Sequence, residues 1–344
     1  MSRAAPIREL VLTRLRVMLR EPEVIFWVFA FPVLLALGLG IAFRDAPPEP
    51  VRVAVVAETG AEGYAARLDG SAEVSPTVMP VDAAMDALRR GEVALVLVGG
   101  QTVLLRYDPT RPEGRTAAAV VDAALQEAAG APRPVPVRAE EIRQRGDRYI
   151  DWLIPGLIGF NLLSTGLWAI GFYIVQMRQN RQLKRLVATP MRRSDFLLSQ
   201  ILARLVFLLL EVPLIVAFAW LVFDVRVEGS LAAVGLITVL GATCFSGLGL
   251  LAATRARTTE GVSGIINVIM MPMLVLSGVF FSASRFPDAV QPLIRILPLT
   301  AVNDALRTVY NDGLPLHAAG VELLIVVAWT AASFLLALRW FRWQ

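Results

Sequence analysis

Residues 152–177 read WLIPGLIGFNLLSTGLWAIGFYIVQM and contain no charged side chain. A helix needs about 20 apolar residues to cross the roughly 30 Å hydrocarbon core of a bilayer. This stretch is therefore long enough to form a transmembrane helix. Outward from it, the chain contains five more apolar stretches of similar length, at residues 24–43, 205–223, 230–254, 261–284 and 318–338, of which the second is interrupted by Glu211 and the last contains Glu322 near its outer end. We predict an α-helical integral membrane protein with six transmembrane helices.

The composition of the whole chain agrees with this fold class. Hydrophobic residues make up 56% of the 344 residues and charged residues 18%, and the mean hydropathy is +0.60. Soluble proteins average roughly 45–50% apolar and about 25% charged residues. The chain is therefore too apolar to be an ordinary soluble protein of two domains.

The scarcity of reactive residues excludes several kinds of chemistry. Cys244 and His317 are the only cysteine and histidine, so an intrachain disulfide is excluded and a Cys/His zinc site or catalytic pair has few residues available. Lys184 is the only lysine and has no glycine near it, so the chain lacks the Gly-x-x-x-x-Gly-Lys loop that binds ATP phosphates. We expect no enzyme activity, no metal and no cofactor in this chain.

Residues 44–150 differ from the rest of the chain because they alternate short apolar runs with polar segments. We predict an inserted small α/β domain, followed by a proline-rich linker at residues 131–136. The predicted strands lie at residues 51–56, 93–98 and 103–107, and the predicted helices at 82–90 and 115–129. The other predicted parts are an amphipathic helix at 1–22, a first transmembrane helix at 23–43 and the remaining five spans within 151–344.

The positions of the basic residues predict the orientation in the membrane. With a cytoplasmic N-terminus, the inside segments hold fifteen Lys and Arg residues and the short outside segments hold four. Positive charge on short loops marks the cytoplasmic side, whereas long translocated domains largely escape this rule. We therefore expect both termini to be cytoplasmic, the first span to be an uncleaved anchor, and residues 44–150 to be extracytoplasmic.

Two cytoplasmic segments combine basic and apolar residues. In residues 7–20 the apolar positions follow helical spacing and arginines occupy much of the remaining surface, which predicts an amphipathic helix at the membrane surface. An anchor attracted to anionic lipid is favoured there, and contact with a cytoplasmic partner is compatible with it. The loop 178–194 contains LKRL at residues 183–186 and TPM at 189–191. Topology explains its charges but not its apolar residues, so we predict a structured turn.

These motifs resemble those of the membrane permease subunits of ABC-2 type exporters. The LKRL and TPM motifs are similar to the cytoplasmic signature of that family. Four further stretches resemble the C-terminal signature of the family. They are LSGVFF at residues 276–281, FP at 286–287, LPLT at 297–300 and DALR at 304–307. The closest likeness is to the branch with a large extracytoplasmic domain between the first two spans. One departure is that residues 178–182, RQNRQ, lack the Glu and Gly that the family shows there, and a homodimer and a heterodimer both stay open.

The resemblance implies a transport pathway powered by other subunits. Two permease subunits would pair in a bacterial cytoplasmic (inner) membrane, and cytoplasmic P-loop ATPase subunits would bind ATP and magnesium. Nucleic-acid binding is not expected. The residues implied in contact with the ATPase are Arg14, Lys184, Arg185, Leu186, Thr189 and Pro190. Residues 283–316 would form an extracytoplasmic re-entrant segment, with gate candidates at Pro298, Thr300, Asp304 and Arg307.

Glu211 is the one acidic residue well inside a predicted span. Intramembrane acids usually face the bundle interior and are paired. Glu211 could contact a cationic substrate or take part in gating, but a structural hydrogen bond to a neighbouring helix is favoured, with Thr243, Ser263 or Asn267 as candidate partners. Arg204 lies seven residues earlier and is expected to be too distant for a direct bond.

Other functions explain the sequence less well. An ion-gradient-driven secondary transporter often shows paired, interrupted helices and sites near the membrane midplane, and here one intramembrane acid and no visible inverted repeat argue against it. A membrane-anchored extracytoplasmic receptor or scaffold would need one anchor, which leaves five spans unexplained. A membrane enzyme would have only one histidine and one cysteine to use.

Overall fold

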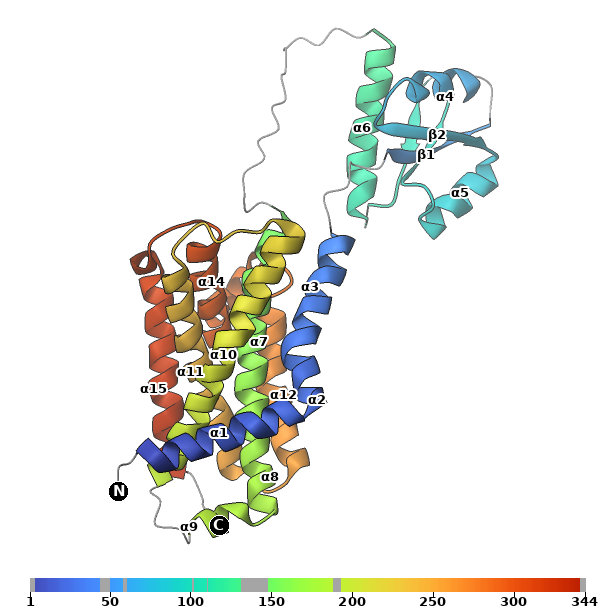
Figure 1. The fold of residues 1–344 in the computed structure, drawn as a ribbon. Coiled ribbons are helices and arrows are strands. Elements are labelled where there is room, and N and C mark those ends of the chain that lie inside the picture. Colours follow the sequence, from blue (N-terminus) through green and yellow to red (C-terminus); the bar gives the residue numbers. More distant parts are fainter. Residues whose placement is uncertain are drawn as a thin grey trace. The chain divides into compact units, whose positions relative to one another are not determined.

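A computed structural model describes residues 4–43, 50–57, 61–100, 102–109, 111–130, 148–187 and 193–340. The chain divides into two compact units (Figure 1). The first unit combines Met1–Arg44 with Arg143–Gln344, and the second comprises Asp45–Ile142.

Among its described residues, the first unit contains six helices that are long and apolar enough to cross a membrane, as predicted. They are Pro22–Ala42, Tyr149–Gln179, Leu198–Phe223, Leu231–Arg255, Thr259–Leu276 and Leu316–Trp340. The first of these spans is built from α2 (Pro22–Ile25), the π-helical turn η1 (Phe26–Ala30) and α3 (Phe31–Ala42). The second is built from α7 (Tyr149–Leu167), the π-helical turn η2 (Trp168–Phe172) and α8 (Tyr173–Gln179).

The remaining helices of this unit are mostly uninterrupted. They are α1 (Ala4–Arg20), α9 (Gln182–Val187), α10 (Arg193–Phe223), α11 (Leu231–Arg255), α12 (Thr259–Leu276), α13 (Gln291–Arg295), α14 (Pro298–Tyr310) and α15 (Gly320–Trp340), with short 3₁₀ turns η3 (Ala283–Arg285), η4 (Asp288–Val290) and η5 (Leu316–Ala319). The apolar run that begins at residue 261 reaches residue 284, but α12 ends at Leu276. It ends there because Gly278 adopts a left-handed conformation, with φ of +69°, which glycine tolerates and a continuing helix does not.

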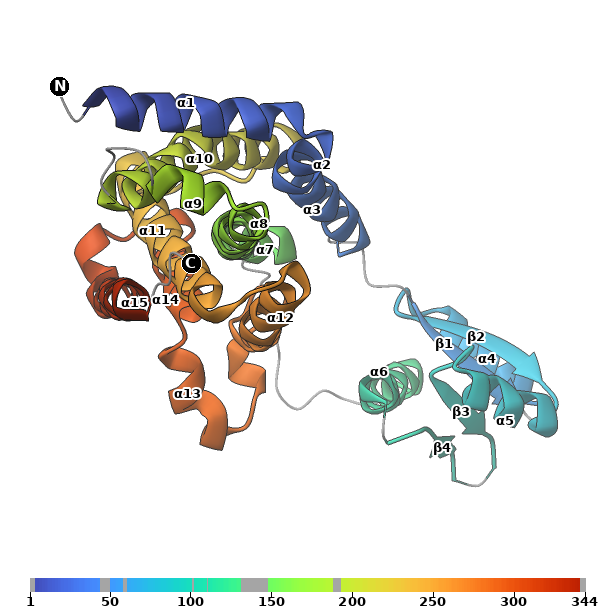
Figure 2. The same cartoon turned by 90° about the horizontal axis from the view of Figure 1, so that it is seen from below.

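The second span lies at the centre of the bundle. Figure 2 looks along α7 and α8 and shows α3, α10, α11 and α12 around them. The span is largely buried, whereas α12 and α15 keep most of their surface exposed. Close contact with α11 depends on Gly166, because a Cβ atom there would lie 2.6 Å from Cβ of Phe245. At its start, the Asp151 carboxylate accepts a hydrogen bond from the Arg148 backbone N–H at 3.3 Å, which caps the helix.

The second unit is a small α/β fold with a four-stranded sheet in the order β2-β1-β3-β4. Its strands are β1 (Val51–Val56), β2 (Val74–Met79), β3 (Leu95–Val98) and β4 (Leu104–Arg106), and its helices are α4 (Ala61–Asp69), α5 (Val81–Arg90) and α6 (Pro112–Ala128). Strand β1 pairs in parallel with β2 and with β3, while β3 and β4 are antiparallel. The predicted small α/β insert is therefore present.

Alternation along β1 builds two cores, one on each face of this sheet. Val53 and Val55 pack with residues of α4 and α6, and Ala54 and Val56 pack with residues of α5. Strand β2 and helix α4 were not predicted from the sequence. Strand β2 contains Pro76, and it lies at the edge of the sheet, where a residue without an N–H is tolerated.

Candidate functional site

The basic loop residues that resemble the family signature lie on a short helix at one end of the bundle. Helix α9 follows α8 after a turn at Arg181, whose φ is +57°. Lys184 and Arg185 are exposed on α9, while Leu183 is buried and fixes the helix to the rest of the unit. Leu186 belongs to α9, but its side chain lies outside the described part of the chain, as do Thr189 and Pro190.

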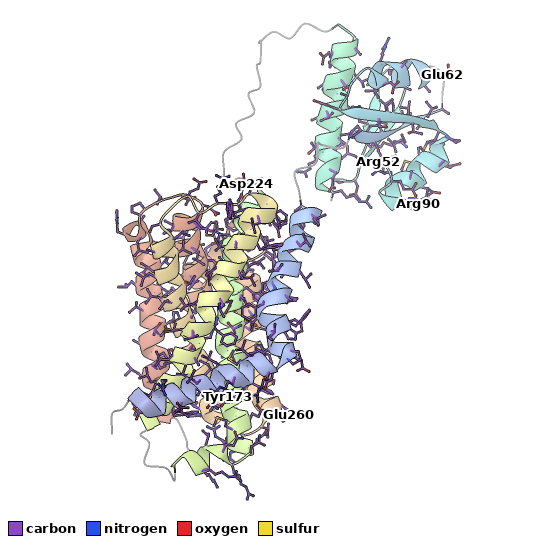
Figure 3. All side chains as sticks on the ribbon, in the orientation of Figure 1. Arg52, Glu62, Arg90, Tyr173, Asp224 and Glu260 are labelled. Carbon is purple, nitrogen blue, oxygen red and sulfur yellow. The ribbon has the colours of Figure 1, made fainter. Side chains whose placement is uncertain are left out.

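Arg14 faces the second span and not the surface. Figure 1 shows α1 lying across the bundle, transverse to α10. From there, Arg14 Nη2 donates to the Ala169 carbonyl at 2.7 Å. Its Cζ atom stands 3.5 Å from the centroid of the Tyr173 ring, a cation–π contact. Figure 3 places Tyr173 at the level of α1.

The environment of Arg14 is nearly closed to solvent. Burial lowers the pKa of its guanidinium, and the facing Tyr173 and Glu21 oppose that shift. A guanidinium stays protonated in proteins even so, which means that a buried positive charge connects α1 to the second span. The exposed side chains of α1 include Arg8, Arg16 and Arg20, and these remain available to a membrane surface or a partner.

Glu211 is paired with Arg204, which corrects the sequence prediction. Arg204 Nη1 lies 2.5 Å from Glu211 Oε2, and Nη2 lies 3.2 Å from Oε1. The seven-residue separation corresponds to about 10 Å of helix rise, but the two long side chains extend toward each other along α10. Both are almost fully buried. The three proposed partners are not used: Thr243 and Ser263 bond within their own helices, and Asn267 is exposed.

The ion pair continues as a polar chain to the first span. Arg204 Nη2 donates to Thr165 Oγ1 on α7 at 2.5 Å. The Thr165 hydroxyl donates to the Asn161 carbonyl, and Asn161 Nδ2 donates to the Val28 carbonyl in η1 at 3.0 Å. Three spans are thus joined by buried polar groups, which inside a membrane are costly unless they are satisfied and are therefore functional candidates.

At the opposite end of the second span, α14 presents Arg307 to α7. The Cζ atom of Arg307 stands 3.3 Å from the centroid of the Trp152 ring, and its Nη2 donates to the Gly278 carbonyl. Its Nη1 lies 3.5 Å from Asp304 Oδ1. One turn earlier, Asn303 Nδ2 donates to the Ser277 carbonyl at 2.9 Å. The left-handed Gly278 and the polar side of α14 therefore meet at this contact.

The other gate candidates also lie on α14. Pro298 is at the first position of the helix, where its missing N–H costs nothing. Thr300 is buried, and the Asp304 side chain is half exposed. The buried part of α14 packs against α7, α11 and α15. The structure thus brings Asp304 and Arg307 together, while Pro298 and Thr300 lie toward the start of the helix.

Several buried polar atoms around α14 have no hydrogen-bond partner among the described residues. They are Trp152 Nε1, Ser277 Oγ, Thr300 Oγ1, Asn303 Oδ1, Arg307 Nε and the Tyr310 hydroxyl oxygen. An unsatisfied buried polar group costs about 1–3 kcal/mol. The contact of α14 with α7 and residues 277–280 is therefore less favourable than an apolar contact of equal size. Among the described residues no group of His, Cys, Asp or Glu could hold a metal ion.

The sequence analysis did not identify Asn161 and Thr165, and it named Arg204 but judged it too distant to bond with Glu211. The available signal was their spacing: Asn161 and Thr165 are four residues apart and share a helix face with Ala169 and Tyr173. Polar residues on one face of an otherwise apolar span indicate a face turned toward protein.

Comparison with known proteins agrees with this architecture. The family model described as ABC-2 family transporter protein matches residues 22–339. The chain belongs to this family. It is 25% identical over 189 residues to the inner membrane transport permease YadH of Escherichia coli K12 and 21% identical over 192 residues to the probable multidrug ABC transporter permease YbhS of the same strain. It is 28% identical over 185 residues to ABC transporter G family member 20 of Dictyostelium discoideum.

These relatives are matched over part of their length. The aligned segments cover 53%, 56% and 53% of this chain for YadH, YbhS and the Dictyostelium protein, and 72%, 50% and 25% of those proteins respectively. Family membership and the six apolar helices identify the chain as a multi-pass membrane subunit of the ABC transporter class.

Proposed function

We propose that this chain forms the substrate pathway of an ATP-driven exporter, as one of two permease subunits that are coupled to separate cytoplasmic P-loop ATPase subunits. The observation that carries the proposal is the family match over residues 22–339 in a chain whose only lysine lies outside any phosphate-binding loop. ATP-driven transport needs an ATP site, and we place that site on a partner subunit. The names of YadH and YbhS, both transport permeases, agree with a pathway-forming role.

The surface proposed to contact the ATPase is formed by α9 and the exposed side of α1. Lys184 and Arg185 offer positive charge on a helix that Leu183 holds in place, so a force applied there would be transmitted to the bundle. The excess of basic residues in the segments on this side supports a cytoplasmic location and cytoplasmic termini. In this orientation the unit Asp45–Ile142 is extracytoplasmic, and residues 283–316 form the outer gate of an inner-membrane exporter.

An ATP hydrolysis assay tests whether the ATPase activity belongs to a partner subunit. The purified chain in lipid nanodiscs should hydrolyse no ATP, whereas a complex co-purified with its P-loop ATPase should hydrolyse ATP and respond to transported compounds. Hydrolysis by the isolated chain would overturn the proposal. A complex that transports in a proton or sodium gradient without ATP would favour a secondary transporter.

Charge reversal tests the contact surface. The double variant Lys184→Glu/Arg185→Glu should lose co-purification with the ATPase or its stimulated activity, because the basic surface of α9 becomes acidic. The matched control is Arg89→Glu/Arg90→Glu in α5 of the second unit, where both side chains are exposed. Equal behaviour of the two double variants would remove α9 from the contact.

Labelling of intact cells tests the orientation. In a Cys244→Ala background, a single cysteine at position 90 should react with a membrane-impermeant maleimide from outside. A cysteine at position 185 should react only after the cells are opened. The reverse pattern would place the second unit in the cytoplasm.

A further inference from the structure

One face of the second span receives a polar contact from another element at each step of four residues, from three elements in all. Asn161 contacts the Val28 carbonyl of the first span, and Thr165 accepts from Arg204 of α10. Ala169 and Tyr173 both contact Arg14 of α1. The face thus connects α1 to the buried Arg204–Glu211 pair along a single helix.

Two of these contacts are made to carbonyls of π-helical turns. The two carbonyls lack their α-helical N–H partner for different reasons. In η1 the Val28 carbonyl would bond to the N–H of residue 32 in an α-helix, but residue 32 is proline and has no N–H. Asn161 supplies the donor that Pro32 lacks. The covalent sequence therefore leaves this carbonyl without an α-helical partner in any state of the protein.

In η2 the corresponding partner exists but is used elsewhere. The Ala169 carbonyl would bond to the N–H of Tyr173 in an α-helix, yet that N–H donates to the Ile170 carbonyl, and Ala169 accepts from Arg14. If Arg14 moved away, an α-helical turn would satisfy Ala169 through Tyr173. The turn η2 thus has two hydrogen-bonded arrangements, and Arg14 satisfies the carbonyl in only one of them. Single π turns inside α-helices are frequent at functional sites.

We propose that Arg14 is a positioning residue that holds η2 in its π form, and that movement of α1 releases η2 to the α form. The residue count is unchanged by the conversion, so α8 turns relative to α7 by about 100° and shifts by about 1.5 Å, the rotation and rise of one residue. α8 leads directly into the turn at Arg181 and into α9. The surface that carries Lys184 and Arg185 would therefore change its position together with α1. The link to ATP hydrolysis rests on the proposed function, whereas the switch in η2 does not.

Spin-label distances in the isolated chain test the switch without any ATPase. In a Cys244→Ala background, labels at Gln176 on α8 and Leu202 on α10, both exposed, report the rotation of α8. Arg14→Leu should add a second distance population or replace the first. A reference pair at Leu202 and Leu335, between α10 and α15, should keep its wild-type distance. An unchanged distance between positions 176 and 202 in a folded Arg14→Leu protein would overturn the proposal.

A one-residue deletion provides the second variant. Deleting Ala169 removes the extra residue of the π turn, so the protein should fold with a continuous α-helix and with α8 in its wild-type orientation. In that deletion background Arg14→Leu should no longer change the distance between positions 176 and 202. Deletion of Leu163 from the regular part of α7 is the control and should prevent folding, since it turns the buried residues between position 163 and η2, Thr165 and Gly166 among them, to a new face. A loss of folding equal in the two deletions would contradict the assignment of η2 as a removable turn.

Asn161→Leu separates the two π turns. It leaves the Val28 carbonyl unpaired but gives η1 no α-helical alternative, so it should lower thermal stability while the distance between positions 176 and 202 stays unchanged. A shift as large as that of Arg14→Leu would show that loosening the bundle in general moves α8, which would refute a specific role of Arg14. If the distances behave as expected but the assembled transporter ignores Arg14→Leu, the switch stands and the proposed coupling to ATP fails.

Discussion

The two ends of the second span meet an arginine in the same way but in different surroundings. At the start of the span Arg307 stands 3.3 Å from the Trp152 ring, and near its end Arg14 stands 3.5 Å from the Tyr173 ring. Around Arg307, its own Nε and Trp152 Nε1 are buried without a hydrogen-bond partner among the described residues. No such atom is found on Arg14 or Tyr173 in the part of the chain that the structure describes.

This difference indicates how each end can move. Water entering the contact of α14 with α7 would satisfy donors and acceptors that are now unpaired, so separation of these elements is partly compensated. Water entering beside Arg14 would replace the hydrogen bond that Arg14 already donates to the Ala169 carbonyl, so separation there gains no new hydrogen bond. We therefore propose that the α14 end opens by hydration and that the α1 end transmits a displacement.

The largest effect is expected between the two ends, at the buried ion pair. Arg204→Leu leaves Glu211 without its partner and should destabilise the protein by about 3–5 kcal/mol. The double variant Arg204→Leu/Glu211→Leu should recover most of that loss, since no uncompensated charge remains. Denaturant titration of the detergent-solubilised protein measures both. If the double variant is as unstable as the single variant, the pair is required for packing and not for charge balance.

A smaller effect is expected from closing the approach of α14 to α7. A Cβ atom at Gly159 would overlap the Asn303 side chain, so Gly159→Val should force α14 outward and cost about 1–3 kcal/mol. Gly264→Val in α12 is the control, because nothing lies within 4 Å of its Cβ position. Thermal unfolding compares the two. Equal costs would show that valine itself is unfavourable in these helices and that the α14 contact is not specific.

The smallest effect is expected from exchanging one cation for another at the two ends. Arg307→Lys and Arg14→Lys keep the charge but lose the planar stacking on the ring, which contributes about 0.5–2 kcal/mol. Each lysine would also lose a bond to a backbone carbonyl, of Gly278 or of Ala169, and we expect a larger loss at Arg307, where several neighbours already lack partners among the described residues. Thermal unfolding of the two single variants measures which one loses more stability. A larger loss of stability in Arg14→Lys would contradict the comparison of the two ends.

Much of the fold follows from local patterns. Apolar runs of about 20 residues, four of them uncharged and two with a single glutamate, predict the six spans, because length and apolarity decide whether a helix can cross a bilayer. The π turn η1 can be explained in the same way, since Pro32 cannot donate to Val28 wherever the helix lies. The small α/β unit was predicted in outline, although the edge strand β2 was missed because Pro76 interrupts an already polar segment.

The polar contacts could not be predicted because they join residues distant in the chain. Arg14 and Ala169 are 155 residues apart, and Arg204 and Thr165 are 39 apart. A periodic pattern shows which face of a helix is polar but not which side chain of another helix meets it. The direction of Arg14 illustrates this limit: the pattern of α1 favours arginines at the surface, yet this one is buried.

The sequence by itself determined a membrane protein with six apolar spans, because hydropathy is a property of the chain alone. Only the tertiary structure decided that Arg14, Arg204 and Arg307 all converge on the second span. The physical reason is that a buried charge must find its partner in space, and helix packing, rather than sequence distance, places that partner within reach.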